Sequence, residues 1–140
     1  MKMLTKIFAI AIIGTSVVAC NNTKNESKAE NAMEEMKDSF ESEQSDLKLK
    51  LEEMKLDVET KLDDINDKIA DATDGNKTKL EKIKADLEET QDDLDRAIDK
   101  VENSTKQAWN DTKEFAKETS NEVEKALKNF GDRVEEVFNS

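Results

Sequence analysis

Few side chains in this 140-residue sequence could take part in chemistry, and most of them are carboxylates. The sequence contains no His, so it lacks the usual base of enzymes at neutral pH. Adjacent acids are numerous and include Asp63-Asp64, Asp92-Asp93 and Glu135-Glu136. Because neighbouring residues of a helix do not face each other, we interpret these pairs as solvated charge. We therefore predict no catalytic residues and no enzyme activity.

A calcium loop is the one metal site that the acids suggest. Asp74, Gly75 and Glu81 match the fifth, sixth and twelfth positions of an EF-hand loop. Its first and third ligand positions fall on Ala70 and Ala72, which have no side-chain oxygen. Too few ligands remain, so we predict no metal site and no dissociable cofactor.

The only cysteine, Cys20, follows a short apolar stretch at the N-terminus. Lys2 and Lys6 make the beginning of the chain basic, and residues 7–18 are mostly Ile, Ala and Val. Such a stretch is shorter than the roughly 20 apolar residues of a membrane-spanning helix and is typical of a secretory signal peptide. An uncleaved membrane helix, a buried core helix and a cut at an ordinary Ala-x-Ala site are the alternatives.

The run Val17-Val18-Ala19-Cys20 resembles the lipobox of bacterial lipoproteins. The resemblance implies that residues 1–19 are a signal peptide cut between Ala19 and Cys20. It also implies a diacylglycerol on the Cys20 sulfur, a covalent lipid that would be the protein's link to a membrane. Two or three acyl chains hold a protein firmly, whereas one chain binds membranes only marginally.

A lipid anchor predicts a place in the bacterial cell envelope. In bacteria with two membranes, an Asp after the cysteine resembles a signal for retention at the inner membrane, and this chain has Asn21 there. The outer membrane is therefore expected in such bacteria, and otherwise the outer leaflet of the cytoplasmic membrane. Residues 20–32, the acylated cysteine and a small polar stretch, predict a flexible tether.

The chain is strongly acidic, with 34 Asp and Glu against 22 Lys and Arg and a net charge of −12. Cleavage would remove Lys2 and Lys6 but no acid, which takes the net charge from −12 to −14. Nucleic acids bind proteins through Lys and Arg that neutralise phosphates. We therefore predict that nucleic acid is not a partner.

Apolar residues recur at helical spacing beyond the tether and predict an all-α protein of long amphipathic helices. A helix over 33–72 carries one stripe, formed by Leu47, Leu51, Met54, Val58, Leu62, Ile65 and Ile69. A helix over 79–102 carries a second stripe, formed by Leu80, Ile83, Leu87, Leu94 and Val101. Because a helix cannot bury such a stripe alone, the stripes predict a helical hairpin, a three-helix bundle or a coiled coil between chains.

Two breaks interrupt the helical pattern. Residues 73–78 predict a turn with Gly75 at its tip in a positive-φ conformation; the alternative is one continuous rod that tolerates the glycine at about 1 kcal/mol. A second break follows residue 102, where Ser104 and Gln107 have the spacing of a capping box. This break predicts a third helix over 104–138.

Residues 105–137 repeat with a period of eleven, as TKQAWNDTKEF, AKETSNEVEKA and LKNFGDRVEEV. This period keeps an apolar stripe nearly straight along a helix. The pattern is similar to the repeats of group 3 late-embryogenesis-abundant proteins and, more loosely, of exchangeable apolipoproteins. The resemblance implies a helix that becomes ordered on lipid, on drying or on a partner.

The bulky residues of this third helix predict a face that enters either a lipid interface or a bundle core. They are Trp109, Phe115, Val123, Phe130, Val134 and Phe138. The acidic character of the segment favours the core, because helices that lie on membranes are usually rich in Lys and Arg.

Together these features predict a membrane-anchored, nonenzymatic helical lipoprotein that acts as a structural spacer, scaffold or interaction module. Its expected partners are the membrane, through the lipid, and other helices or copies of itself. Narrow apolar stripes form contacts between helices and do not enclose cavities, so we expect no small-molecule substrate. The alternatives are a stress-protective, lipid-surface-binding helix protein and a cell-surface ligand or adhesin.

Overall fold

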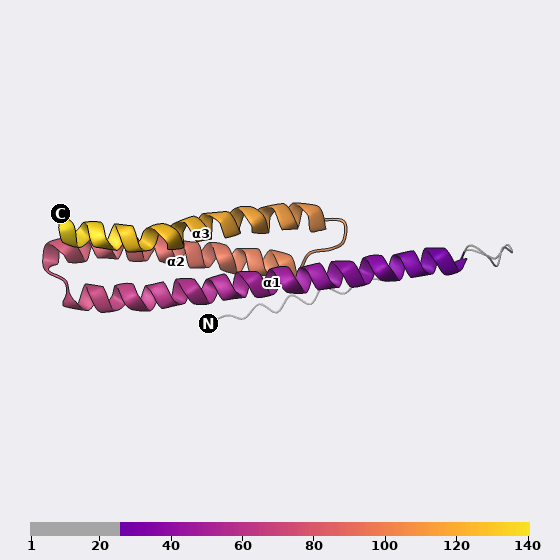
Figure 1. Ribbon diagram of the computed structural model, residues 1–140, viewed down its shortest axis with the longest axis horizontal. Helices are drawn as coiled ribbons and strands as arrows, with labels where there is room; N and C mark the ends of the chain where they lie inside the picture. The colour runs from indigo at the N-terminus through magenta and orange to yellow at the C-terminus, as the bar shows by residue number, and fades with distance from the viewer. Residues whose placement is uncertain (1–25) are drawn as a thin grey trace, which may run out of the picture.

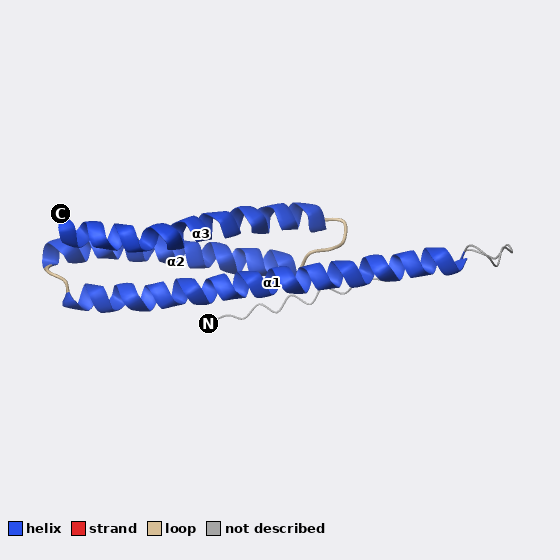
Figure 2. Ribbon diagram, viewed as in Figure 1, coloured by secondary structure: helices blue, strands red, loops and turns tan. Residues whose placement is uncertain are grey.

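The computed structural model describes residues 26–140, which form three helices. They are α1 (Glu26–Asp71), α2 (Asp74–Glu102) and α3 (Trp109–Asn139). The described part contains no strand (Figure 2), which confirms the predicted all-α class. Of the three predicted arrangements, the structure has the three-helix bundle. The predicted signal peptide, Ala19, Cys20 and the tether up to residue 25 lie outside the described residues.

Neighbouring helices in the chain run antiparallel, so that α3 returns parallel to α1 (Figure 1). On the α1–α2 side, Lys55 Nζ lies 2.5 Å from Asp95 Oδ1. On the α2–α3 side, Arg133 lies 2.5 Å from Asp86. These pairs join residues far apart in the sequence and define the register of the bundle.

The hydrophobic core consists of two clusters of buried side chains. The turn cluster, near the α1–α2 turn, contains Ile65, Leu80, Ile83, Leu87, Phe130, Val134 and Val137. The loop cluster, near the α2–α3 loop, contains Leu51, Met54, Val58, Leu94, Ala97, Val101, Trp109, Ala116 and Val123. Leu62 packs against both clusters, so the apolar interior is continuous along the bundle.

The turn between α1 and α2 is shorter than predicted, and Gly75 is not its tip. Gly75 lies within α2, and no described residue has a positive φ. Thr73 is the N-cap, with φ −69° and ψ 158°, and Asp74 begins the helix. The Thr73 side chain makes no cap hydrogen bond, but the Thr73 carbonyl accepts from the backbone N–H of Lys77 at 2.8 Å, and Asp74 in the first turn complements the helix dipole. α2 therefore begins at Asp74 and not at residue 79.

The third helix begins at Trp109 and not at residue 104, and the predicted capping box does not form. The Ser104 hydroxyl lies 2.9 Å from the Thr112 hydroxyl and donates to the carbonyl of Thr105. The Ser104 side chain therefore contacts the loop carbonyl of Thr105 and the side chain of Thr112 in α3, and it does not cap the helix. Ala108 occupies the N-cap position without a side-chain cap.

The first helix begins earlier than predicted, because residues 26–32 of the expected tether are helical. These residues include Glu, Lys and Ala, which have high helix propensity. Extending an existing helix adds one hydrogen bond for each residue fixed, so propagation needs no apolar stripe. The prediction of a flexible tether is wrong over this stretch.

One end of α1 extends past the other two helices (Figure 1). α1 has 46 residues, against 29 in α2 and 31 in α3. The first residue of α3, Trp109, packs against Phe40 of α1. We call Glu26–Ser39 the free segment; its 14 residues span about 21 Å.

Candidate functional site

The two predicted stripes of α1 and α2 lie in the bundle interior. Nine of their residues are buried: Leu51, Met54, Val58, Ile65, Leu80, Ile83, Leu87, Leu94 and Val101. Leu47, Leu62 and Ile69 are partly buried and pack against the same clusters. Within this one chain, the stripes therefore pack on each other and on α3, and these residues are not a free surface for a partner.

The predicted bulky face of α3 also packs into the bundle, with one exception. Trp109, Val123, Phe130 and Val134 are buried. Phe115 is partly buried, and Lys100 Nζ lies 3.6 Å from its ring centre. Phe138, predicted to enter either a lipid interface or the core, is 50% exposed and does not pack into the core. It lies in the last turn of α3, next to Val137, which takes the buried position.

An aromatic corner forms where α3 begins against α1. The rings of Phe40 and Trp109 meet edge to face, with centres 5.2 Å apart. The Trp109 indole N–H donates to Glu43 Oε2 at 2.8 Å, and Lys113 Nζ donates to the same oxygen at 3.0 Å. These contacts attach the first turn of α3 to α1.

The aromatic corner also changes the acidity of Glu43. The hydrogen bond from Trp109, followed by the hydrogen bond and charge of Lys113, lowers the pKa of the Glu43 carboxyl below its ordinary value. Both donors favour the ionised carboxylate. The corner is therefore an electrostatic contact as well as an apolar one.

Polar contacts between α1 and α2 continue from this corner along the bundle. Gln44 Nε2 donates to the carbonyl of Val101 at 2.5 Å, and Lys48 forms an ion pair with Glu102. The hydrogen bonds that Lys48 and Lys55 donate to the carboxylates of Glu102 and Asp95, respectively, raise the pKa values of the two lysines. Exposed pairs of this kind each contribute little to stability. They are best explained as setting the register of the helices.

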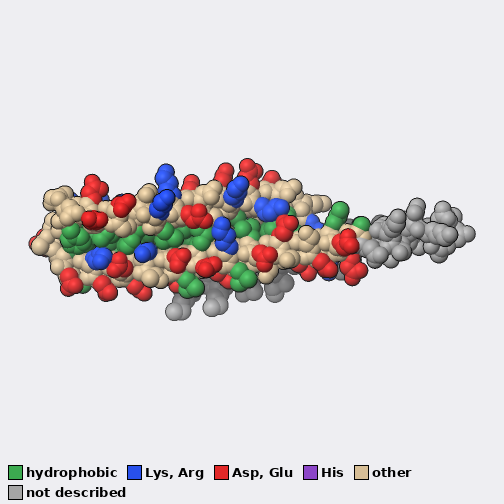
Figure 3. All heavy atoms as spheres, in the orientation of Figure 1, with side chains coloured by type: hydrophobic (Ala, Val, Ile, Leu, Met, Phe, Trp, Pro, Cys, Tyr) green, Lys and Arg blue, Asp and Glu red, His purple; other side chains and the backbone are tan. Residues whose placement is uncertain are grey.

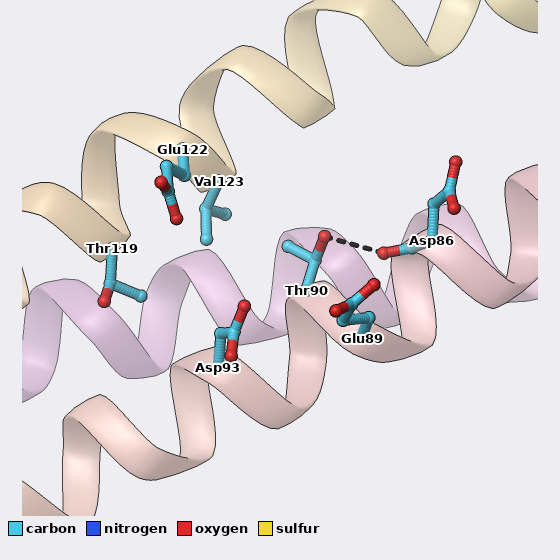
Figure 4. A pocket seen from close by; sticks show the side chains of 7 residues that line it. All are labelled: Asp86, Glu89, Thr90, Asp93, Thr119, Glu122 and Val123. Atoms are coloured by element: carbon cyan, nitrogen blue, oxygen red, sulfur yellow. Dashed lines mark hydrogen bonds between the residues drawn. The ribbon is translucent and has the colours of Figure 1, made fainter.

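A groove of about 240 Å³ between α2 and α3 is lined mainly by acids and threonines (Figure 4). Its lining residues are Asp86, Glu89, Thr90, Asp93, Thr119, Glu122 and Val123. The Thr90 hydroxyl donates to the carbonyl of Asp86, so it is occupied by its own helix. Across residues 26–140, no three His, Cys, Asp or Glu side chains are arranged to hold a metal ion. The groove is therefore an acidic surface hollow.

The free segment presents the most exposed apolar side chains of the described surface. Met33 is 74% exposed and Met36 is 69% exposed. Figure 3 shows hydrophobic and acidic side chains side by side at this end of α1. A groove of about 390 Å³ joins the free segment to the beginning of α3; its lining includes Met36, Phe40, Trp109 and Lys113.

Sequence reasoning did not find the aromatic corner or the free segment. The available signal was spacing: Met33, Met36, Phe40 and Leu47 lie at intervals of three, four and seven residues, which place them on one helix face. Reasoning also missed Ala116 and Ser120, which are buried on α3. Both are small residues, and small residues give no apolar signal.

Comparisons with protein-family models, with curated proteins and with solved structures gave no match. None of the helices within residues 26–140 has the length and apolar character needed to cross a bilayer.

Proposed function

We propose that this protein is a nonenzymatic, lipid-anchored scaffold of the bacterial cell envelope. The lipid at Cys20 would hold the chain at a membrane, and α1 would act as a stalk that carries the three-helix bundle away from it. One observation carries the proposal: α1 continues past the bundle on the side of the chain that leads back to Cys20.

The length of the stalk follows from the number of helical residues in the free segment. The free segment contributes about 21 Å of helix beyond the aromatic corner. Five residues, 21–25, separate Cys20 from the first residue of α1. A membrane anchor at Cys20 would therefore leave the bundle clear of the lipid headgroups.

The packing of α3 supports a scaffold over a lipid-surface-binding role. Opening α3 would expose its five large buried apolar residues, Trp109, Val123, Phe130, Val134 and Val137. At roughly 2 kcal/mol for each side chain, this exposure would cost on the order of 10 kcal/mol. Anionic lipid would also repel so acidic a chain. The bundle is thus the favoured state of α3 away from a strongly attracting surface.

Mass spectrometry of the N-terminus in the producing bacterium tests the anchor. The proposal expects a mature chain that begins at Cys20 and carries a diacylglycerol, and a Cys20→Ser variant that carries no lipid and leaves the membrane fraction. A wild-type chain that begins at Met1 with a free thiol would contradict the proposal.

The single Trp of the chain tests the stalk. Trp109 lies at the end of the bundle nearest the free segment, so its fluorescence reports whether this end touches lipid. In vesicles that contain brominated lipid, we expect the anchored protein to show no quenching of Trp109. Strong quenching would favour a lipid-surface-binding role for α3 over a spacer.

A further inference from the structure

We infer that the free segment of α1 is the docking site for a basic amphipathic helix of a partner protein. The inference rests on the proposed scaffold role and gives the chemistry of its partner. It does not require the lipid at Cys20. The side chains that would receive the partner are Met33 and Met36 of the free segment and Phe40, the residue that follows it.

The three side chains form a continuous apolar stripe that ends at the aromatic corner. Their spacing of three and four residues places them on one face of α1. Amphipathic helices dock into apolar grooves through anchors at this spacing. Methionine suits such a surface because its flexible, polarizable side chain adapts to partners of different shape.

The stripe occupies a position that neighbouring helices fill elsewhere along α1. Over Leu47–Ile69, α2 and α3 pack on the apolar face of α1. α2 ends at Glu102, near Gln44, and α3 begins at Trp109, on Phe40. Beyond these points the same helix continues without either neighbour (Figure 1). A partner helix would therefore extend the bundle by continuing the line of α2 or α3.

The walls of the groove define where the partner helix would end. The groove is bounded by Met36 and Phe40 on α1 and by Trp109 and Lys113 on α3. The Trp109 ring is fixed by its hydrogen bond to Glu43 and its contact with Phe40. A helix lying on the free segment would thus meet a preformed aromatic wall.

Charge complementarity identifies the partner as basic. Residues 32–43 contain five acids and one base, Lys37, which lies 3.8 Å from Glu41. Glu34, Glu35 and Asp38 flank the methionines and form no ion pair within the described part of the chain. Lys or Arg on a docked helix would lie within the screening length of about 8 Å at physiological salt.

The same charges argue against two other occupants. Two free segments packed together would bring both sets of acids close to each other, so a second copy is disfavoured. Anionic lipid would be repelled in the same way. Both occupants are outcomes of the test below.

A peptide titration tests the docking site. The full-length protein is placed in nanodiscs of zwitterionic lipid, with empty nanodiscs as the blank. The probe is a fluorescent 21-residue synthetic helix, on the order of six turns, with Leu on one face and Lys on the other. A charge-reversed peptide with Glu in place of Lys and a scrambled Lys/Leu peptide are the comparison probes. We expect the basic helix to bind more tightly than either.

Two matched double variants locate the binding. Met33→Gln with Met36→Gln changes the free segment. Leu49→Gln with Leu56→Gln changes two residues of α1 beside the bundle that are 60% and 63% exposed, close to the 74% and 69% of the methionines. Burial of two methionine side chains contributes more than about 1.4 kcal/mol to the free energy of binding. We therefore expect the first variant to weaken binding at least about tenfold. The second should remain within about twofold of the wild type. Circular dichroism confirms that both variants are folded.

Several results would overturn the inference. They are equal binding of the charge-reversed or scrambled peptide, equal losses of affinity in the two double variants, and no binding of the basic helix.

Sedimentation that shows a dimer abolished by the methionine changes would assign the stripe to a second copy. Reduced vesicle binding of the same variant, without its lipid, would assign the stripe to a membrane. A lipidated Cys20 with no peptide binding would refute the docking site alone, and peptide binding with an unlipidated Cys20 would refute the anchor alone.

Discussion

Two regions of the same helix, α1, have similar apolar spacing and different surroundings. Over Leu47–Ile69, the apolar face lies against α2 and α3, and Leu51, Val58 and Ile65 are fully buried. Over the free segment, Met33 and Met36 remain largely exposed. The comparison shows that spacing determines which face of a helix is apolar, whereas the lengths of neighbouring helices determine whether that face is covered.

The charges of the two regions differ in the same way. Lys48, Lys50 and Lys55 of the covered region form ion pairs with acids of α2 or α3. The free segment contains five acids and only two bases, Lys28 and Lys37. A helix of about this length is marginal by itself in water. A partner would therefore stabilise the free segment as well as cover it.

Alanine substitution gives the largest expected difference between the two regions. Leu94→Ala removes a fully buried side chain of α2 that packs in the loop cluster with α1, and we expect it to lower the free energy of unfolding by about 2–5 kcal/mol. Met36→Ala, at a 69% exposed position, should change it by no more than about 0.5 kcal/mol. Urea unfolding followed by far-UV circular dichroism measures both. Equal losses would show that the free segment is packed in solution.

Much of the bundle could be predicted from sequence because its signals are local. Leu80, Leu87 and Leu94 follow a helical period, and a change at residues 72–78 marks the turn. The tip was misplaced because Gly75 attracts a turn assignment, whereas in the structure the backbone is extended at Thr73 and helical from Asp74 onward. Exposure of Met33 could not be predicted, because it depends on where α2 and α3 end in space.

A substitution at the boundary between the two regions has a smaller expected effect. Phe40→Leu keeps an apolar side chain but removes the aromatic pair with Trp109, which should cost about 0.5–1.5 kcal/mol beyond the loss of buried area. Met36→Leu, one turn away in the free segment, is the matched control and should be neutral. Thermal unfolding followed by Trp109 fluorescence tests the pair. If Met36→Leu lowered the unfolding temperature as much as Phe40→Leu, the boundary between the covered region and the free segment would lie nearer the N-terminus than Phe40.

The pH dependence of Glu43→Gln gives the smallest expected effect. The pKa of Glu43 is lowered in the folded protein, so its ionised form contributes stability above the ordinary Glu pKa of about 4.3. This contribution is lost as pH falls through the lowered folded pKa. We expect wild type to exceed Glu43→Gln in urea midpoint near neutral pH and to converge with it in acid.

An exposed acid provides the control for the pH series. Glu53→Gln makes the same charge change at a position of α1 that forms no ion pair in the described part of the chain. The difference in urea midpoint between this variant and the wild type should not shrink comparably as the pH falls. Parallel pH profiles for the two variants would contradict an electrostatic role for the aromatic corner.

Hydrogen exchange of the full-length protein, with peptide-level resolution, tests the contrast within α1 most directly. The account predicts strong protection over Leu47–Ile69, fast exchange over Glu26–Ser39, and a gain of protection in the free segment when the basic helix is added. Equal protection of both regions without the added helix, or a helix that protects only the bundle, would contradict it.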